Sequence, residues 1–115
     1  MMESKMFEYK ATINNVVDGD TVDAFIDLGF KVCIKQRLRL AGLDTPERGK
    51  PGYLEAKAFV IDKVLNKVVT IKTEKVSKWG YFLADVFIDG SHLNLALLAE
   101  GLARPYNGGN KDDAP

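Results

Sequence analysis

Two segments within the first 30 residues have the hydrophobic composition of strands. The segments 8–17 and 20–29 are rich in β-branched and aromatic residues, which favour strands. An Asp-Gly-Asp sequence at positions 18–20 joins them, and Asp-Gly pairs are frequent in the tight turns of hairpins. The pattern therefore predicts a β-hairpin over residues 8–29.

A third strand is expected over residues 30–42, where apolar and polar residues alternate after Gly29. Its apolar side chains fall on one face: Val32, Ile34, Leu38 and Leu40. The opposite face carries one thiol and three cations: Cys33, Lys35, Arg37 and Arg39. Because neighbouring residues of a strand point to opposite faces, this strand is predicted to have one buried face and one cationic face.

A loop and then a helix are expected after the third strand. Residues 45–52 hold two prolines and two glycines, which favour a loop. From Tyr53 to Lys67, apolar residues recur at helical spacing among Lys, Glu and Asp residues. This spacing predicts one buried helix face, made of Leu54, Ala58, Ile61 and Leu65.

Two further strands and a second helix are expected in the last part of the chain. Residues 68–74 and 81–90 are rich in β-branched and aromatic residues, and the second segment closes on an Asp-Gly turn. Residues 92–100 are predicted to form a short helix, with Ser91 as its N-cap and Gly101 as its C-terminal stop.

The order of the expected elements is three strands, a helix, two strands and a helix. By itself this pattern indicates a small α+β or barrel protein. Five short strands with a helix between strands 3 and 4 are also the connectivity of the OB fold, the oligonucleotide/oligosaccharide-binding barrel. We therefore expect a mainly β protein with α-helices (α+β), built as a five-stranded OB-fold barrel with a C-terminal helix.

The length of the chain is that of a single domain. With 115 residues the chain can bury one core, so residues 1–115 are expected to form one domain. Residues from about 107 to 115 are rich in Gly, Asp and Pro and are expected to be a flexible tail.

Composition and charge narrow the classes of function. Sixteen Lys and Arg balance sixteen Asp and Glu, which excludes the strong positive field of a sequence-independent nucleic-acid coat. One cysteine and one histidine cannot build a Cys/His zinc site, and Cys33 is expected to be buried or half-buried. No apolar run resembles a membrane span or a secretory signal, so we expect a cytoplasmic monomer without membrane contact. Whether an upstream signal peptide was removed stays open.

Acidic residues lie where strands are expected to end. Asp18 and Asp20 flank the first turn, and Asp44 follows the third strand. Two carboxylates with a backbone carbonyl and water suit a hard cation such as calcium or magnesium. Each residue also has a simpler explanation: a hairpin turn for the aspartates, an exposed loop for Glu47 and a solvated strand face for Arg39.

Five sequence blocks together point to a family. They are VVDGDTV (16–22), RLAGLDTPE (39–47), GYLEAKAF (52–59), KWGYFLADVFIDG (78–90) and NLALLAEGLARPY (94–106). In their order and spacing the chain resembles the staphylococcal nuclease family from Tyr9 to Tyr106. The resemblance implies an OB-type barrel and calcium-dependent hydrolysis of phosphodiester bonds in DNA or RNA, with single-stranded DNA or RNA as the expected partner.

The resemblance also implies roles for particular residues. Asp20, Asp44 and the backbone carbonyl of Thr45 match the family's metal ligands, and Asp18 matches an acidic residue beside the metal that does not ligate it directly. Glu47 matches the proposed general base, and Arg39 matches an arginine that grips the scissile phosphate. Three residues match positions that contact the substrate phosphate: Lys78, Trp79 and Tyr81.

Tyr81 departs from the family pattern, because it stands where the family carries a second catalytic arginine. A phenol donates one hydrogen bond but brings no positive charge. Two functions therefore stay open: a weakened phosphodiesterase, or a catalytically impaired OB-fold module that binds nucleic acid or protein. Another cation could also take the place of the missing arginine, and the candidates are Lys78, Arg37, Arg48 and Arg104. Because the acidic residues are retained together, we expect the enzyme.

Overall fold

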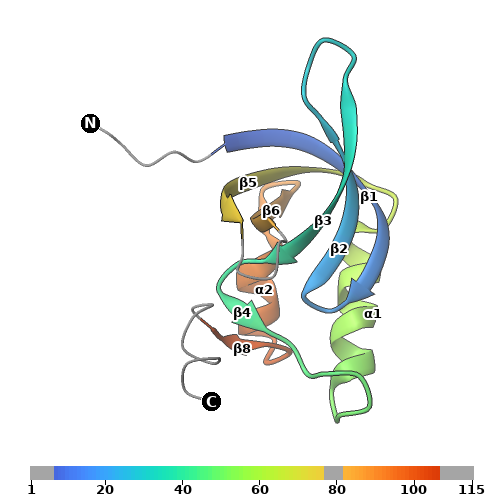
Figure 1. Ribbon diagram of the computed structural model, residues 1–115. Helices are drawn as coiled ribbons and strands as arrows, with labels where there is room; N and C mark the ends of the chain where they lie inside the picture. Colours follow the sequence, from blue (N-terminus) through green and yellow to red (C-terminus); the bar gives the residue numbers. More distant parts are fainter. Residues whose placement is uncertain (1–6, 77–81, 107–115) are drawn as a thin grey trace, which may run out of the picture.

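Strands of the described chain close into a small barrel (Figure 1). The computed structural model describes residues 7–76 and 82–106. The five long strands are β1 (Phe7–Asp18), β2 (Thr21–Asp27), β3 (Cys33–Leu40), β5 (Val68–Val76) and β6 (Phe82–Ile88). They are ordered β3-β2-β1-β5-β6, and a parallel pairing of β3 with β6 closes the barrel. The expected five-stranded OB-fold barrel is confirmed.

Strand β1 curves because its register shifts twice. Its pairing with β2 slips between Ile13 and Asn15 and again between Val16 and Asp18. Such bulges bend and twist a strand, which allows β1 to pair with β2 over Lys10–Asp18 and with β5 over Phe7–Thr12. The hairpin predicted from the Asp-Gly-Asp sequence is present, since Asp18 pairs with Thr21 across the turn.

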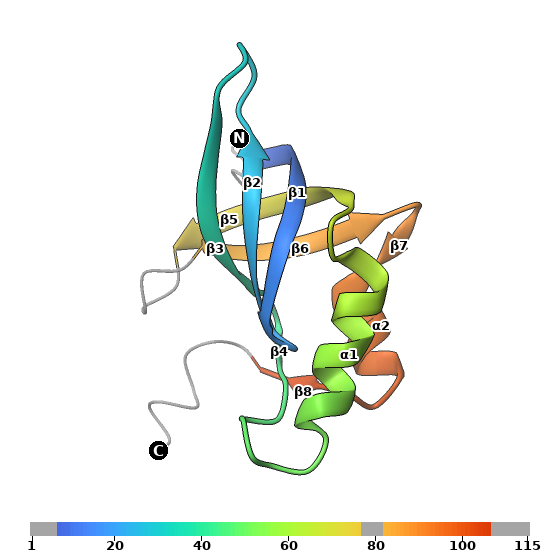
Figure 2. The same ribbon diagram turned by 90° about the vertical axis from the view of Figure 1, so that its right-hand side faces the viewer.

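Two helices pack on the barrel, in the expected order (Figure 2). The short strand β4 (Leu43–Asp44) precedes α1 (Tyr53–Val64), and β7 (Ser91–His92) precedes α2 (Leu93–Ala99). A final short strand, β8 (Arg104–Pro105), pairs with β4. No helix in the described part of the chain is long and apolar enough to span a membrane.

The ends of the two helices are set by residues next to them. Helix α1 ends at Val64, within the predicted limit of Lys67, because Leu65 is extended and Asn66 has a φ of +63°. The prediction of Ser91 as an N-cap is wrong. After the Asp-Gly turn Ser91 continues the strand pairing with Ile88, so that His92 takes the N-cap position without a side-chain hydrogen bond.

The predicted buried face of α1 is also wrong. The helix buries Tyr53, Ala56, Val60 and Val64, whereas Leu54 is 73% exposed and Ile61 is 38% exposed. Both rows have helical spacing, and three of the four predicted positions lie one residue, or about 100° around the helix, after a buried one. The buried row is the one that packs on the barrel, since Val60 and Val64 belong to the core cluster. Ala56 lies close to the β1–β2 turn, because an added Cβ at Gly19 would lie 2.8 Å from the Ala56 Cβ.

The core fills the barrel and the space under the helices. Its largest fully buried side chains include Ile13, Leu38, Leu40, Ile71 and Leu97. The β2–β3 hairpin extends away from this core, as Figures 1 and 2 both show. For this reason Val32 and Ile34, expected on the buried face of β3, are 49% and 39% exposed. The expectation for Cys33 is wrong as well, because this thiol is exposed.

Candidate active site

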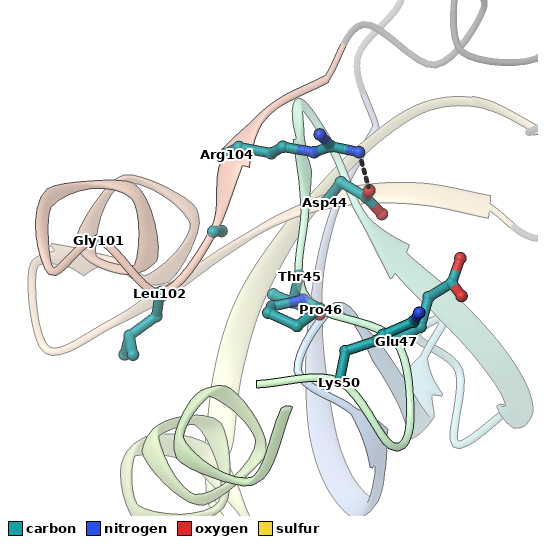
Figure 3. Close-up of a pocket in the computed structure, with 9 residues that line it drawn as sticks. Asp44, Thr45, Pro46, Glu47, Lys50, Gly101, Leu102 and Arg104 are labelled. Atoms are coloured by element: carbon teal, nitrogen blue, oxygen red, sulfur yellow. Dashed lines mark hydrogen bonds and ion pairs between the residues drawn. The ribbon is translucent and has the colours of Figure 1, made fainter. Parts of the chain in front are cut away.

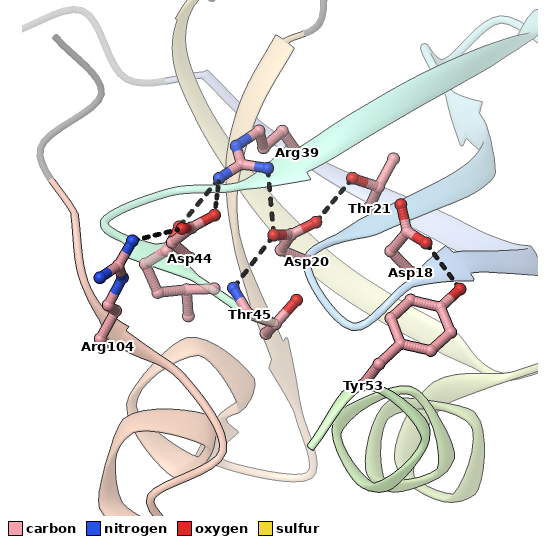
Figure 4. Close-up of polar contacts among 9 residues, drawn as sticks. Asp18, Asp20, Thr21, Arg39, Asp44, Thr45, Tyr53 and Arg104 are labelled. Atoms are coloured by element: carbon pink, nitrogen blue, oxygen red, sulfur yellow. Dashed lines mark hydrogen bonds and ion pairs between the residues drawn. The ribbon is translucent and has the colours of Figure 1, made fainter. Parts of the chain in front are cut away.

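The β1–β2 turn, the end of β3 and the short strand β4 meet at one place, where Asp20, Arg39 and Asp44 gather (Figure 4). The register of β2 and β3 sets Arg39 opposite Thr21, and Thr21 directly follows Asp20 in the chain. The Leu40 N–H donates to the Asp20 carbonyl at 2.8 Å, which fixes the turn against β3. Residues far apart in the sequence are thus brought together by strand pairing.

Arg39 joins the two carboxylates. Its Nη1 lies 3.1 Å from Asp20 Oδ2, and its Nη2 lies 3.1 Å from Asp44 Oδ1. The same Nη2 donates to the Leu43 carbonyl at 3.2 Å. The three side chains are only 16%, 8% and 11% exposed for Arg39, Asp20 and Asp44. Charges withdrawn from water in this way interact more strongly than surface charges.

Asp20 is held by two further donors. The Thr21 hydroxyl donates to Oδ1 at 2.9 Å, and the Thr45 N–H donates to Oδ2 at 3.1 Å. With Arg39, three groups therefore fix the orientation of this carboxylate. A buried carboxylate with satisfied oxygens keeps its position before any ligand arrives.

Thr45 adds a buried hydroxyl to this site. Its Oγ1 has no hydrogen-bond partner within the part of the chain that the structure describes. An unpaired buried hydroxyl costs about 1–3 kcal/mol, so such a group calls for a bound water or ligand. The oxygen faces the β1–β2 turn, since a Cβ added at Gly19 would lie 3.0 Å from it.

Gly19 gives a test of how the turn is placed. A Cβ added there would lie 2.8 Å from the Ala56 Cβ and 3.0 Å from the Thr45 Oγ1. Because the Ala56 Cβ is fixed to the helix backbone, Gly19→Ala is expected to lower the free energy of unfolding by about 2 kcal/mol in urea denaturation. The double variant G19A/A56G is expected to lose less free energy of unfolding than the sum of the losses in the two single variants. Strict additivity would show that contact with α1 is not the cause.

Among the contacts that the structure describes, Asp18 has no hydrogen bond or ion pair with Arg39, Asp20 or Asp44. Its Oδ1 accepts a 2.8 Å hydrogen bond from the Tyr53 hydroxyl on α1 (Figure 4). The Asp18 carboxylate raises the pKa of the Tyr53 phenol, because deprotonation would break this bond and place two negative charges together. Asp18 therefore links the β1–β2 turn to the first residue of α1.

An open pocket of about 470 Å³ lies beside Asp44 (Figure 3). The loop after β4 and the segment between α2 and β8 form its walls. Its lining residues are Asp44, Thr45, Pro46, Glu47, Lys50, Gly101, Leu102, Ala103 and Arg104. Glu47, the predicted general base, is exposed on this loop rather than buried with the other acids.

Arg104 approaches the site from β8. The β4–β8 register sets it directly opposite Asp44, and its Nη2 lies 3.4 Å from Asp44 Oδ2. Its side chain is 72% exposed, whereas that of Arg39 is 16% exposed. Tyr106 also reaches the site, since the Arg39 guanidinium lies 5.5 Å from its ring centroid. The sequence pattern gives no reason to place Tyr106 here, because only the β4–β8 pairing shows where this end of the chain lies.

Three predicted substrate contacts, Lys78, Trp79 and Tyr81, lie outside the described residues. Their predicted roles therefore stay predictions.

The donor set has the chemistry that a hard cation prefers. Asp20 and Asp44 supply carboxylate oxygens within contact of one Arg39 guanidinium. Within residues 7–76 and 82–106, however, no group of three or more His, Cys, Asp or Glu side chains is close enough to hold a metal ion. These residues fit calcium if its ligands are two carboxylates, a backbone oxygen and water. Arg39 would then give up some of its contacts with the two carboxylates.

Fold and site together define an OB-fold barrel with a buried arginine–carboxylate cluster at the end of its strands. A family model described as "Staphylococcal nuclease homologue" matches residues 37–114, a range that includes Arg39, Asp44 and Glu47. The chain belongs to the staphylococcal nuclease family.

Several relatives support this assignment. The chain is 36% identical to a thermonuclease of Staphylococcus hyicus, over 77% of this chain and 54% of that protein. It is 36% identical to a thermonuclease of Staphylococcus intermedius, over 80% of this chain and 56% of that protein. A micrococcal nuclease of Shigella flexneri is 24% identical, over 86% of this chain and 59% of that protein. The chain thus spans little more than half the length of these relatives.

Proposed function

We propose that this protein is a calcium-dependent nuclease that hydrolyses phosphodiester bonds in DNA or RNA. The observation that carries the proposal is the position of Arg39 between two nearly buried carboxylates beside an open pocket. Buried ion pairs add little net stability, because desolvation offsets much of the attraction. A cluster of this kind is therefore better explained by a role in catalysis than by a contribution to the stability of the fold.

Each residue of the cluster has a role in this reaction. Asp20, Asp44 and the Thr45 carbonyl would hold the ion, with Asp18 near it. Bound calcium would supply positive charge against the developing charge on the phosphate. Glu47, on the exposed loop, accepts a proton from the attacking water. Arg39 donates two parallel N–H bonds to phosphate oxygens, which a planar guanidinium does well.

The bonds that change are those at phosphorus. Water attacks in line, the bond from phosphorus to the 5′ oxygen breaks, and the departing oxygen takes a proton. The products are a 3′-phosphate and a 5′-hydroxyl. Lys78, Trp79 and Tyr81 are proposed to contact the substrate near this phosphate.

Arg104 is the best candidate for a second cation at the phosphate. It contacts Asp44 and lines the pocket, and its largely exposed guanidinium has room to turn from Asp44 to a substrate. Arg37 is held elsewhere by Asp23, at 2.7 Å, and its guanidinium lowers the pKa of that carboxyl. Arg48 lies over the Tyr53 ring, at 5.7 Å. The geometry thus favours Arg104 over these two candidates.

Arg104→Gln is expected to lower the rate of calcium-dependent cleavage by about a hundredfold, because one charged donor to the phosphate is lost. Arg37→Gln and Arg48→Gln, assayed beside it, are expected to lose far less. Adding Tyr81→Arg to the Arg104→Gln variant should restore part of the rate, since a cation returns to the site. An equal loss in all three single variants would mean that Arg104 acts only through net charge.

The proposed function is tested by incubating end-labelled single-stranded DNA and RNA with the protein, in calcium and in excess chelator. We expect cleavage only with calcium and 3′-phosphate ends on the products. If the protein binds the strands and leaves them intact at high concentration, it is an OB-fold binding module instead.

A further inference from the structure

The tip of the β2–β3 hairpin presents a phenylalanine to solvent. Phe30 is 98% exposed, at the end of a hairpin that projects from the barrel in Figures 1 and 2. The turn is closed by two backbone hydrogen bonds, from Leu28 N–H to the Val32 carbonyl at 2.8 Å and from Val32 N–H to the Gly29 carbonyl at 2.9 Å. Phe30 is therefore held in an ordered turn.

The backbone at this tip is strained. Phe30 has a φ of +55° and Lys31 a φ of +63°, in the left-handed region that Gly and Asn adopt much more easily. A hairpin turn with two such residues strongly prefers Asn-Gly or Gly-Gly. Phe30 thus combines an unfavourable backbone conformation with an apolar ring in water. Strained residues of this kind cluster at binding sites, where another interaction offsets the strain.

The outer face of the hairpin continues from the tip toward Arg39. The strand register sets Phe25 opposite Lys35, and the Lys35 Nζ lies 5.7 Å from the Phe25 ring centroid. Phe25 is 41% exposed. Further along β3 on the same face is Arg39, opposite Thr21. Arg39 is nine positions after Phe30, or about 30 Å of extended strand.

The two lysines of the hairpin, Lys31 and Lys35, are available to bind an anion. Within the described residues, neither Lys31 nor Lys35 has a carboxylate at ion-pair distance, whereas Arg37 on the same strand is paired with Asp23. Exposed aromatic rings next to unpaired cations are the features with which proteins bind single-stranded nucleic acid. Bases stack on the rings, and phosphates lie against the cations.

We propose that the hairpin surface formed by Phe25, Phe30, Lys31 and Lys35 binds single-stranded nucleic acid and leads the strand to Arg39. Its direction toward a cleavage site rests on the proposed nuclease function, but its affinity for the strand does not. Bases stack on Phe30 and Phe25, and the two lysines contact phosphates between them. The apolar tip is thus explained as a binding surface whose strain is offset when a base covers it.

The test uses Phe30→Asn, because asparagine adopts the left-handed conformation without the ring. We expect the Tm to rise by about 5 °C as strain is relieved. In chelator, where cleavage is absent, the affinity for a labelled 12-nucleotide strand should fall about tenfold, which is the loss of one stacked base. The affinity for a 3-nucleotide strand, too short to reach the tip from Arg39, should not change. Lys35→Gln should flatten the salt dependence of 12-nucleotide binding by about one phosphate contact.

The control is Leu54→Asn, which removes an apolar side chain that is 73% exposed on α1. It should leave both affinities unchanged. Unchanged 12-nucleotide binding by Phe30→Asn, or no binding by the parent at low salt, would overturn the proposal. The proposal would also be overturned if the tip has a different binding partner. Two results would show this: the parent sediments as a dimer and Phe30→Asn as a monomer, or the parent binds anionic lipid vesicles and Phe30→Asn does not. If the parent never cleaves but binds the strand in a way that depends on Phe30, the proposed nuclease function is contradicted. The hairpin proposal is then still supported.

Discussion

Arg39→Gln is expected to lower the rate of calcium-dependent cleavage about a thousandfold, the largest loss in activity that we predict. The guanidinium is the proposed bidentate donor to the phosphate, and glutamine offers one neutral donor in its place. The measurement is single-turnover cleavage of labelled single-stranded DNA in calcium. Arg39→Lys, which keeps the charge without the planar fork, should lose less than Arg39→Gln and remain well below the parent.

The same substitution also affects stability, because Arg39 neutralises Asp20 and Asp44. Removing one partner of a buried ion pair costs about 3 kcal/mol or more, since charges are left without compensation. The assay must therefore run well below the Tm of the variant, as checked by circular dichroism. Lys63→Gln, in the last turn of α1, removes a positive charge away from the site and should change neither property much. A folded Arg39→Gln variant with parental activity would make Arg39 a structural residue only.

Asn94→Ala is expected to lower the free energy of unfolding by about 3 kcal/mol, the largest loss of stability that we predict without a change of charge. Asn94 is 2% exposed, and its carboxamide makes three hydrogen bonds. Its Oδ1 accepts from Val86 N–H at 3.0 Å, and its Nδ2 donates to the Ala41 and Ala84 carbonyls at 3.0 and 3.1 Å. Alanine would leave buried backbone groups of β6 and of the β3–β4 connection without partners.

Urea denaturation measures this loss, with Asn15→Ala as the control. Asn15 is exposed and makes one hydrogen bond, to Asp23, so its removal should cost less than about 1 kcal/mol. Because Ala41 lies three residues before Asp44, Asn94→Ala is also expected to loosen the site. Equal losses in the two variants would show that the buried hydrogen bonds of Asn94 add nothing specific.

The strands and their order were predictable from local sequence. Period-two alternation and the Asp-Gly turns depend on neighbouring residues, and both survive in the structure. What failed depends on contacts between distant residues. The buried row of α1 packs on the barrel core and close to Gly19, over thirty residues earlier, and helical spacing alone does not indicate these contacts. The first register shift of β1, by contrast, falls where its alternation breaks at Asn14 and Asn15, so that the buried positions change from Ala11 and Ile13 to Val16. Cys33 is exposed because the hairpin extends past the core, which no local pattern indicates.

The site divides in the same way. Asp20, Arg39 and Asp44 were singled out from sequence blocks, and strand pairing brings them into contact. Asp18 was predicted to lie beside the metal without ligating it, and in the structure its carboxylate accepts a hydrogen bond from the Tyr53 hydroxyl. Arg104 could only be one of several candidate cations, since the pairing of β4 with β8 joins residues 60 positions apart.

The central claim is that the Asp20–Arg39–Asp44 cluster is a phosphodiesterase centre. The most direct measurement compares the parent and Asp20→Asn in one experiment, as the calcium-dependent rate of single-stranded DNA cleavage at single turnover. We predict calcium-dependent cleavage by the parent and a rate lower by at least about a hundredfold for Asp20→Asn, which loses a carboxylate oxygen from the cluster. Equal rates for the two proteins, or no calcium-dependent cleavage by the parent at any concentration, would contradict the claim.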